Sequence, residues 1–349
     1  MSKILIVAPY QFGELSDCYY WAKYSKENNQ VWYIGYRQRN SSITSRSLEG
    51  IKIWQPVKFK NNILFGAYFY LNVIFKILIN KIDNVIICNM PYAELLPLLF
   101  KRKNIVFDIR TLSVVENEEI RLRADTSTIK RARCFKHVSV ISNGLIRKIA
   151  LNNTSLLPLG AEELSLKNKK FDIMRMMYIG TFNGRKLEDF LQGVLMFKMK
   201  YKIQFTCDII GNGDPQTTKK IQNIAKEIGS EVVLHGYLNH EESQLYFDNC
   251  NIGICYVPQT EYYEEQPATK LYEYFLSGMA AIATSTHAIK EDMLLGCGVL
   301  IEDNPNSVCE GLKKMHDLMP TYESSDIRKK SQKYHWSLIF EHNFLSLFS

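Results

Sequence analysis

Short apolar, β-branched runs alternate with helix-forming segments along the chain, and this alternation stops once and then restarts. The strands predicted in the first half are 3–8, 30–34, 84–90, 104–110, 137–142 and 154–160. Those predicted in the second half are 174–180, 204–211, 231–236, 251–257, 279–284 and 297–301. Strands that alternate with helices form parallel sheets. The sequence therefore predicts two doubly wound α/β domains.

A polar segment separates the two series of strands. Residues 161–172, AEELSLKNKKFD, have no apolar period, and we expect them to form an interdomain linker. The chain has 349 residues, 46% of them apolar, and is too long for one ordinary core. We therefore predict an N-terminal domain of residues 1–165 and a C-terminal domain that begins at residue 166.

Cysteine usage and apolar stretches exclude several protein classes. The eight cysteines include no CxxC pair and no Cys/His spacing that would hold zinc, which fits reduced residues in a cytosolic protein. The first residues lack a long apolar region, so we expect no signal peptide. The longest apolar stretch, 63–75, ends at Lys76 and is too short to span a bilayer. It predicts a helix that is buried or docks on a surface.

The formal net charge of +7 is unevenly distributed. Residues 1–165 carry 23 Lys and Arg against 13 Asp and Glu, whereas residues 166–349 carry 20 against 23. The first half therefore attracts anions: nucleic acid, an anionic membrane surface or a phosphate-bearing lipid. The basic clusters at 101–103 and 130–136 have no nucleic-acid motif beside them, and solvated helix faces are their plain alternative. We expect no nucleic-acid partner.

The segment EEQPATKLYEYFLSG, 264–278, is typical of a helix that begins at a proline. Pro267 suits the first helical position, which would leave the amides of Ala268, Thr269 and Lys270 without partners. Free amides and the positive end of the helix dipole attract phosphate, and the Lys270 ammonium adds a full charge. The segment therefore predicts a phosphate site at the start of a helix.

Two acids flank this helix start. Glu273 lies one turn further in, on the same face as Lys270, where a buried carboxylate could accept both hydroxyls of a ribose. Glu265, in the loop before the helix, could accept sugar hydroxyls. The alternative is a surface helix in which Lys270 and Glu273 form a solvated ion pair.

Two further strand ends carry glycines or cations. The segment IIGNGDP contains Gly211 and Gly213, which allow a ligand to approach the backbone closely. The segment YIGTFNGRK places Gly180 before Arg185 and Lys186, and two cations suit a diphosphate. The alternatives are an ordinary turn and an exposed basic loop. Because all these segments end strands at one sheet edge, together they predict a nucleotide site.

The order of YIG…RK, IIGNGDP, LHGYL, YFDNCNIGICYVP and EQPATKLYEYFLSGMAAIAT resembles the donor-binding half of retaining nucleotide-sugar glycosyltransferases of the GT-B architecture, family 4. The resemblance covers about residues 174–300, and it includes two glutamates with seven residues between them. It implies two Rossmann-like domains that face a central cleft, with the donor domain at 166–333. It also implies that a final helix, about 334–349 and anchored by Trp336, crosses back to the N-terminal, acceptor-binding domain.

The resemblance also implies roles for single residues. Glu273 would hold the ribose, Glu265 and the amides after it the donor sugar, and Lys186 the diphosphate, while the backbone around Tyr237 would frame the base. Thr181 stands where the family usually has an arginine, whose charge Arg185 would replace. The complete set of donor-site candidates is Gly180, Thr181, Arg185, Lys186, Gly211, Gly213, Tyr237, Glu265, Gln266, Pro267, Ala268, Thr269, Lys270 and Glu273.

The first half of the chain resembles the family more loosely. Gly13 lies in the place of a glycine-rich first loop, and Asp108, Arg110 and Thr111 are the nearest counterparts of an acceptor-side catalytic loop. The alternative for Asp108 and Arg110 is a structural ion pair. His287 follows a strand end, where it lines the cleft or is a plain loop histidine. The candidate catalytic residues are Glu265, Lys186, Asp108 and Arg110.

The function implied is transfer of a sugar from a UDP- or GDP-sugar to a lipid-linked or polysaccharide acceptor. Retaining transfer without a nucleophile is usually assigned to front-face attack, and no DxD carboxylate pair is present, so we expect neither metal nor cofactor. The basic first half and the 63–75 helix suggest docking at the inner face of the plasma membrane. A sugar-nucleotide epimerase of the same shape and a non-catalytic binding protein are the alternatives. A dehydrogenase is disfavoured, since neither half has a GxGxxG after its first strand.

Overall fold

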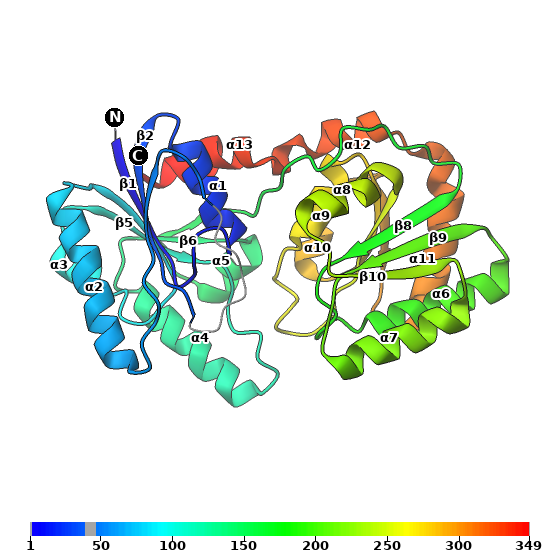
Figure 1. Ribbon diagram of the computed structural model, residues 1–349, viewed down its shortest axis with the longest axis horizontal. Coiled ribbons are helices and arrows are strands. Elements are labelled where there is room, and N and C mark those ends of the chain that lie inside the picture. Colours follow the sequence, from blue (N-terminus) through cyan, green and yellow to red (C-terminus); the bar gives the residue numbers. More distant parts are fainter. Residues whose placement is uncertain (1, 39–46, 349) are drawn as a thin grey trace. The chain divides into compact units, whose positions relative to one another are not determined.

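The computed structural model describes residues 2–38 and 47–348 (Figure 1). The chain forms two compact units, one of Met1–Leu159 with Trp336–Ser349 and the other of Gly160–His335. The sequence-based divisions, after residues 165 and 333, lie close to these. Each unit is built on a parallel sheet with helices on both faces, so the predicted α/β class is confirmed.

The sheet of the first unit has seven parallel strands in the order β3-β2-β1-β4-β5-β6-β7. Their bounds are β1 Ser2–Val7, β2 Asn29–Ile34, β3 Ile51–Trp54, β4 Asn84–Cys88, β5 Asn104–Ile109, β6 His137–Val140 and β7 Thr154–Leu156. The edge strand β3 was not expected from the sequence. It has only four residues and none of them is fully buried, so its apolar pattern is short and weak.

Helices cover both faces of this sheet (Figure 1). Their bounds are α1 Ser16–Ser25, α2 Asn62–Ile79, α3 Leu95–Leu99, α4 Glu118–Ala132 and α5 Asn143–Ile149. One core cluster joins α2, α3 and α5 to one face of the sheet, and a second joins α1 to the other face. Helix α4 was not expected either: its buried positions include Arg121, Asp125 and Thr128, and polar residues at helical spacing give no hydrophobic period.

The last residues of the chain complete the second of these clusters. Helix α13, Trp336–Ile339, continues into a π-helical turn, Phe340–Phe344, and a 3₁₀ turn, Leu345–Phe348. The Trp336 ring is buried and stacks on Tyr20 of α1, with ring centres 5.2 Å apart. The segment is therefore an integral part of the first unit's core.

The sheet of the second unit has six parallel strands in the order β10-β9-β8-β11-β12-β13. The strands are β8 Met174–Ile179, β9 Phe205–Ile210, β10 Val232–Gly236, β11 Ile252–Cys255, β12 Ala280–Thr284 and β13 Gly298–Ile301. The helices are α6 Leu187–Tyr201, α7 Pro215–Ile228, α8 His240–Asn249, α9 Thr269–Leu276, α10 His287–Asp292, α11 Pro305–Leu318 and α12 Ser324–Ser331. Strand order reverses between β8 and β11, and ligands of doubly wound sheets bind at such a point, beyond the carboxyl ends of the strands.

The expected linker, residues 161–172, packs on the second unit. Ser165 Oγ donates a hydrogen bond to Asp248 Oδ1 over 2.7 Å, and the buried Lys169 Nζ donates to Ser165 Oγ over 2.9 Å. Burial lowers the pKa of Lys169 to about 8. Hydrogen bonds of its polar residues hold much of this segment, together with a ring contact of Phe171 with Tyr322, and such polar contacts give no apolar period that would distinguish it from a free linker.

Candidate active site

A lysine reaches the end of strand β8 at the point where the strand order of the second sheet reverses. The Lys270 Nζ atom lies 3.1 Å from the position that a Cβ on Gly180 would occupy. It also sits 4.0 Å from the centre of the Tyr178 ring, a cation–π distance. The turn after β8 and the helix after β11 are thus joined at one place, as the sequence predicted from their shared sheet edge.

Helix α9 begins at Thr269, so Pro267 is not its first helical residue. Ala268 occupies the N-cap position, and alanine has no side-chain acceptor. The Gln266 amide donates to the Tyr263 carbonyl, and this turn fixes the loop that precedes α9, so the helix begins after the turn. Among the described residues, the amides of Ala268, Thr269 and Lys270 have no hydrogen-bond acceptor, as predicted.

The start of α9 has no side-chain cap, unlike most helices of its unit. Side chains cap the four helices α7, α8, α10 and α11, through Asp214, Asn239, Thr286 and Asn304. Helices α6 and α12 share the lack of a side-chain cap with α9, and of these three only α6, which follows β8, and α9 begin beside the reversal of strand order. The two helices that flank the reversal of strand order therefore leave their first amides available to an anionic ligand.

Glu273 lies one turn inside α9 and is half-buried. Burial raises the pKa of its carboxyl group to about 6, against the opposing effect of Lys270. Within the described residues its carboxylate accepts no hydrogen bond. A partly desolvated acid without a partner can accept two hydroxyl groups from a ligand.

A histidine holds Glu265, the other predicted acid. His287 Nδ1 lies 3.0 Å from Glu265 Oε1, and the His287 amide donates to Glu264 Oε2 over 2.9 Å. The first residue of α10 thus fixes the loop that precedes α9. From the sequence His287 was either a cleft residue or a plain loop histidine, and its link to an acid 22 residues away is visible only in the fold.

The predicted glycines bring the turns after β8 and β9 together. A Cβ on Gly211 would lie 1.8 Å from the Gly180 carbonyl oxygen, and the backbone of Gly211 is in the positive-φ region. A Cβ on Gly213 would approach Asn183 Oδ1 to 2.7 Å. Contact between the two turns therefore accounts for these glycines without any ligand.

A cavity of about 310 Å³ opens where strands β8, β9 and β10 end. Four predicted donor-site residues line it: Gly180, Thr181, Gly211 and Tyr237. Tyr237 is exposed. The cavity adjoins Gly180, beside which the Lys270 ammonium lies, so a ligand seated in it can extend towards the start of α9.

The two predicted cations after Gly180 already have partners. The Arg185 guanidinium lies 4.9 Å from the centre of the Tyr263 ring, in the loop before α9. Lys186 Nζ forms an ion pair with Asp303 Oδ2 over 3.2 Å, and Asp303 also accepts the Gln259 amide. A diphosphate would compete with Asp303 for Lys186, whereas Lys270 has no carboxylate within ion-pair distance among the described residues.

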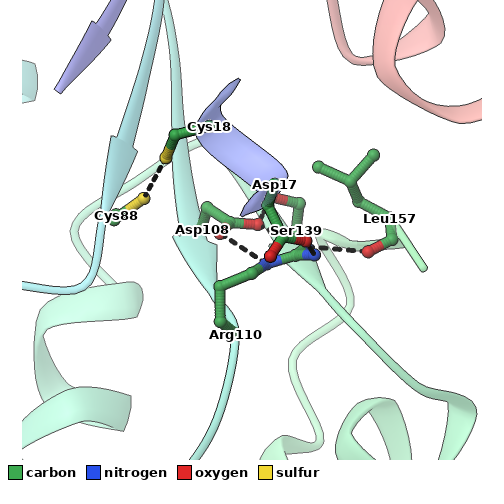
Figure 2. Close-up of polar contacts among 7 residues, drawn as sticks. All are labelled: Asp17, Cys18, Cys88, Asp108, Arg110, Ser139 and Leu157. Atoms are coloured by element: carbon green, nitrogen blue, oxygen red, sulfur yellow. Dashed lines mark hydrogen bonds and ion pairs between the residues drawn. The ribbon is translucent and has the colours of Figure 1, made fainter. Parts of the chain in front are cut away.

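Asp108 and Arg110 belong to a buried network in the first unit (Figure 2). The Arg110 Nε and Nη2 atoms donate to both oxygens of Asp108, each over 2.8 Å. Nη1 donates to Asp17 and Nη2 also to the Leu157 carbonyl, while Ser139 Oγ donates to Asp108. Four of the five guanidinium N–H groups are thus used inside the fold. This geometry favours the structural alternative for the pair.

Two other acceptor-side candidates are also described. Thr111 Oγ1 donates to the Leu112 carbonyl over 2.6 Å, and Gly13 has a φ of 85° that favours glycine. Asp17, which completes the network of Figure 2, was not among the candidates. Its sequence neighbours carry no sign of a partner 93 residues away.

The second unit matches a known family, and the whole chain resembles known structures. Residues 174–317 match the family described as Glycosyl transferases group 1. None of the curated proteins compared matches the chain. A glycosyltransferase from Rickettsia africae has a TM-score of 0.75 at 14% identity, over 99% of this chain and 97% of that one.

Two further structures cover nearly all of both chains. The lipopolysaccharide outer core galactosyltransferase WaaB has a TM-score of 0.71 at 15% identity, with 99% of this chain and 98% of that one covered. Sucrose-phosphate synthase from Thermosynechococcus elongatus has 0.71 at 13% identity, with 97% and 96% covered. At such identities the likeness shows the fold, which is that of GT-B enzymes. The family match over residues 174–317 and the GT-B fold of the two units together support a glycosyltransferase enzyme.

Proposed function

We propose that this protein transfers a sugar from a UDP- or GDP-sugar to a lipid-linked or polysaccharide acceptor, as a retaining, metal-independent, family 4-like enzyme of surface polysaccharide biosynthesis, of the capsule or lipopolysaccharide type. It would work in the cytoplasm at the inner face of the plasma membrane. The observation that carries the proposal is the unpartnered Glu273 carboxylate, one turn inside a helix whose first amides are free and whose Lys270 side chain lies beside Gly180. The resemblance to the lipopolysaccharide galactosyltransferase WaaB supports the pathway.

Each part of a nucleotide sugar has a place in this arrangement. Glu273 would accept the ribose hydroxyls, the cavity beside Tyr237 would take the base, and the α9 amides with Lys270 would bind the diphosphate. Glu265, fixed by His287, would receive hydroxyls of the donor sugar.

The chemistry follows from where charge develops. As the bond between the anomeric carbon and the diphosphate breaks, negative charge grows on the leaving oxygen, which the α9 amides and Lys270 stabilise. The acceptor oxygen then bonds to the anomeric carbon from the same face. Its proton passes to the leaving phosphate oxygen, so configuration is retained without a protein nucleophile.

An assay with a panel of nucleotide sugars, with and without membrane lipid extract, tests the proposal. Free nucleotide together with labelled lipid is the expected result. A changed sugar still attached to its nucleotide would instead identify an epimerase. Glu273→Ala should abolish donor binding, while Glu227→Ala, an exposed acid on α7, should leave it unchanged. Unaltered turnover in Glu273→Ala would refute the assignment.

A further inference from the structure

The outer face of helix α2 is apolar along its whole length. Leu64, Leu71, Phe75 and Leu78 repeat at helical spacing, and 63%, 66%, 55% and 60% of their respective surfaces are exposed. We call these four residues the α2 stripe. A contiguous row of large apolar side chains on a surface marks a place where something binds.

The opposite side of α2 belongs to the core of the first unit. Phe65, Phe69, Val73 and Ile77 are almost fully buried against the sheet. The helix, Asn62–Ile79, is longer than the 63–75 stretch, so the expectation that it is too short to span a bilayer was wrong: by length and composition α2 is apolar enough to cross a membrane, and 28% of its residues are buried inside the protein. Leaving the sheet would expose the Phe65–Ile77 side, so α2 can lie on a membrane without crossing it.

The charges in the segment that contains α2 are of one sign, and Asp83, directly after this segment, is paired with Lys103. No Asp or Glu occurs from Gly50 to Ile82, while Lys58 and Lys60 precede the helix and Lys76 and Lys81 lie at its end. A second copy of this chain docked through the same stripe in a symmetric pair would bring lysines of the two copies close together, because both ends of the helix carry lysines. An anionic bilayer instead attracts them while it accepts the apolar side chains.

An aromatic cavity of about 240 Å³ lies at the first turns of α2. Tyr36, Phe65, Tyr70 and Tyr92 line it together with Lys58, and it lies beyond the carboxyl ends of β2 and β4. The Tyr70 hydroxyl donates to the Pro91 carbonyl over 2.7 Å, which ties this wall to α2. Docking by α2 would thus bring the cavity to the bilayer surface.

We propose that the α2 stripe and its flanking lysines form an interfacial docking surface for an anionic lipid bilayer, with α2 lying in the plane of the headgroups. The inference rests on the proposed function only for its purpose, the delivery of a lipid-borne acceptor to the first unit. It names the surface by which that unit would reach the membrane.

Sedimentation with lipid vesicles, without donor or acceptor, tests the proposal. The protein should pellet with vesicles of phosphatidylcholine and phosphatidylglycerol in equal parts, less with phosphatidylcholine alone, and less as salt is raised. Leu71→Glu/Phe75→Glu should lower the partition coefficient roughly tenfold or more, because charges enter the interface poorly. Met199→Glu/Leu295→Glu, at positions 72% and 92% exposed in the second unit, makes the same charge change and should bind as the unaltered protein does.

The proposal would be overturned if the unaltered protein did not sediment with anionic vesicles, or if both double variants bound equally. It would also be overturned by a dimer that forms without lipid and that dissociates in Leu71→Glu/Phe75→Glu alone. The last would identify a second copy as the occupant of the stripe. Circular dichroism melts establish that both variants are folded. Donor turnover measured without vesicles tests the proposed function separately. An enzyme that is active but does not bind vesicles would therefore contradict the docking proposal and leave the proposed function intact.

Discussion

The partly desolvated Glu273 carboxylate lowers the stability of the folded protein, and hydrogen bonds from a ligand would offset this loss. Because burial raises the pKa of its carboxyl group to about 6, the ionised form is disfavoured in the fold at pH 7. Glu273→Gln should therefore raise the free energy of unfolding at pH 7, by at most about 2 kcal/mol after allowance for partial exposure. The same change should weaken nucleotide-sugar binding. Chemical denaturation and titration calorimetry measure the two effects.

The pH dependence of this gain has a defined sign. The ordinary pKa is 4.5, so the charge cost of Glu273 is absent below that pH, grows as pH rises towards 6 and is complete above it. The stability advantage of Glu273→Gln should follow the same course, while donor binding by the unaltered protein should fall as pH drops through 6. An advantage that is equal at pH 4 and pH 8 would contradict this assignment.

Arg110→Met tests whether the network of Figure 2 is structural. The change leaves the buried Asp108 and Asp17 carboxylates without their counter-charge, which should cost the first unit about 3–5 kcal/mol of stability. Asp108→Asn/Arg110→Met should recover part of the loss. A well-folded Arg110→Met protein that fails to transfer sugar would instead identify the pair as catalytic.

At this scale, the sequence predicts which residues lie together when those residues are near in the chain. Lys270 and Glu273 share one helical turn, so their common face follows from spacing alone. The partners of Arg110 and Glu265 come from distant segments, Asp17 and His287, and only the fold brings them together. The residues next to Asp17 and His287 in the sequence form no pattern that predicts which residue each of them contacts.

The start of α9 is where one element carries the site. Ala268→Asp should cap the helix and stabilise it by about 0.5–2 kcal/mol, because the aspartate side chain would accept hydrogen bonds from the amides that alanine leaves free. It should also weaken donor binding, because the carboxylate takes the place of a phosphate oxygen. The melting temperature should therefore rise, while the donor affinity measured by calorimetry should fall.

Matched changes at the same position separate charge from capping. Ala268→Asn caps without charge and should weaken the donor less than Ala268→Asp does, while Ala268→Gly leaves the amides free and should bind the donor normally. Donor affinity that is equal in all three variants would mean that no phosphate rests on the α9 amides.

Elements with a clear hydrophobic period were predicted from the sequence, and those without one were missed. All six strands of the second sheet were expected, because each is a buried, β-branched or apolar run between turn residues. Helix α4 buries Arg121, Asp125 and Thr128 instead, and β3 is a short edge strand. Hydrogen bonding and edge position decide such elements, and neither appears in an apolar pattern.

At the scale of the whole molecule, Trp336→Ala should act on one unit only. The change removes the stacked contact with Tyr20 and leaves a cavity in the first unit's core, at a cost of about 3–5 kcal/mol. Nucleotide binding, placed in the second unit, should persist at temperatures where the first unit has unfolded. Limited proteolysis combined with calorimetry would show this, and simultaneous loss of both units would contradict it.

The two sheets follow from the alternation of strands and helices, but the path of the chain between units does not. Residues 161–172 are polar like a free linker, yet they pack through hydrogen bonds such as that of Lys169 to Ser165. The prediction that the last segment returns to the first unit rested on the family resemblance. Its apolar period, read alone, would suit either core.

The return of Trp336, Phe340 and Phe344 to the first unit sets an order on folding during synthesis. A ribosome makes the chain from its amino end, so all of Gly160–His335 has been synthesised before these three side chains exist. The first unit therefore keeps open to water the part of one face of its sheet and of α1 that these residues cover, until the second unit has been synthesised in full. Nascent chains of this protein should accordingly need shielding of that open face, and the earlier-made unit should be the last to become resistant to protease.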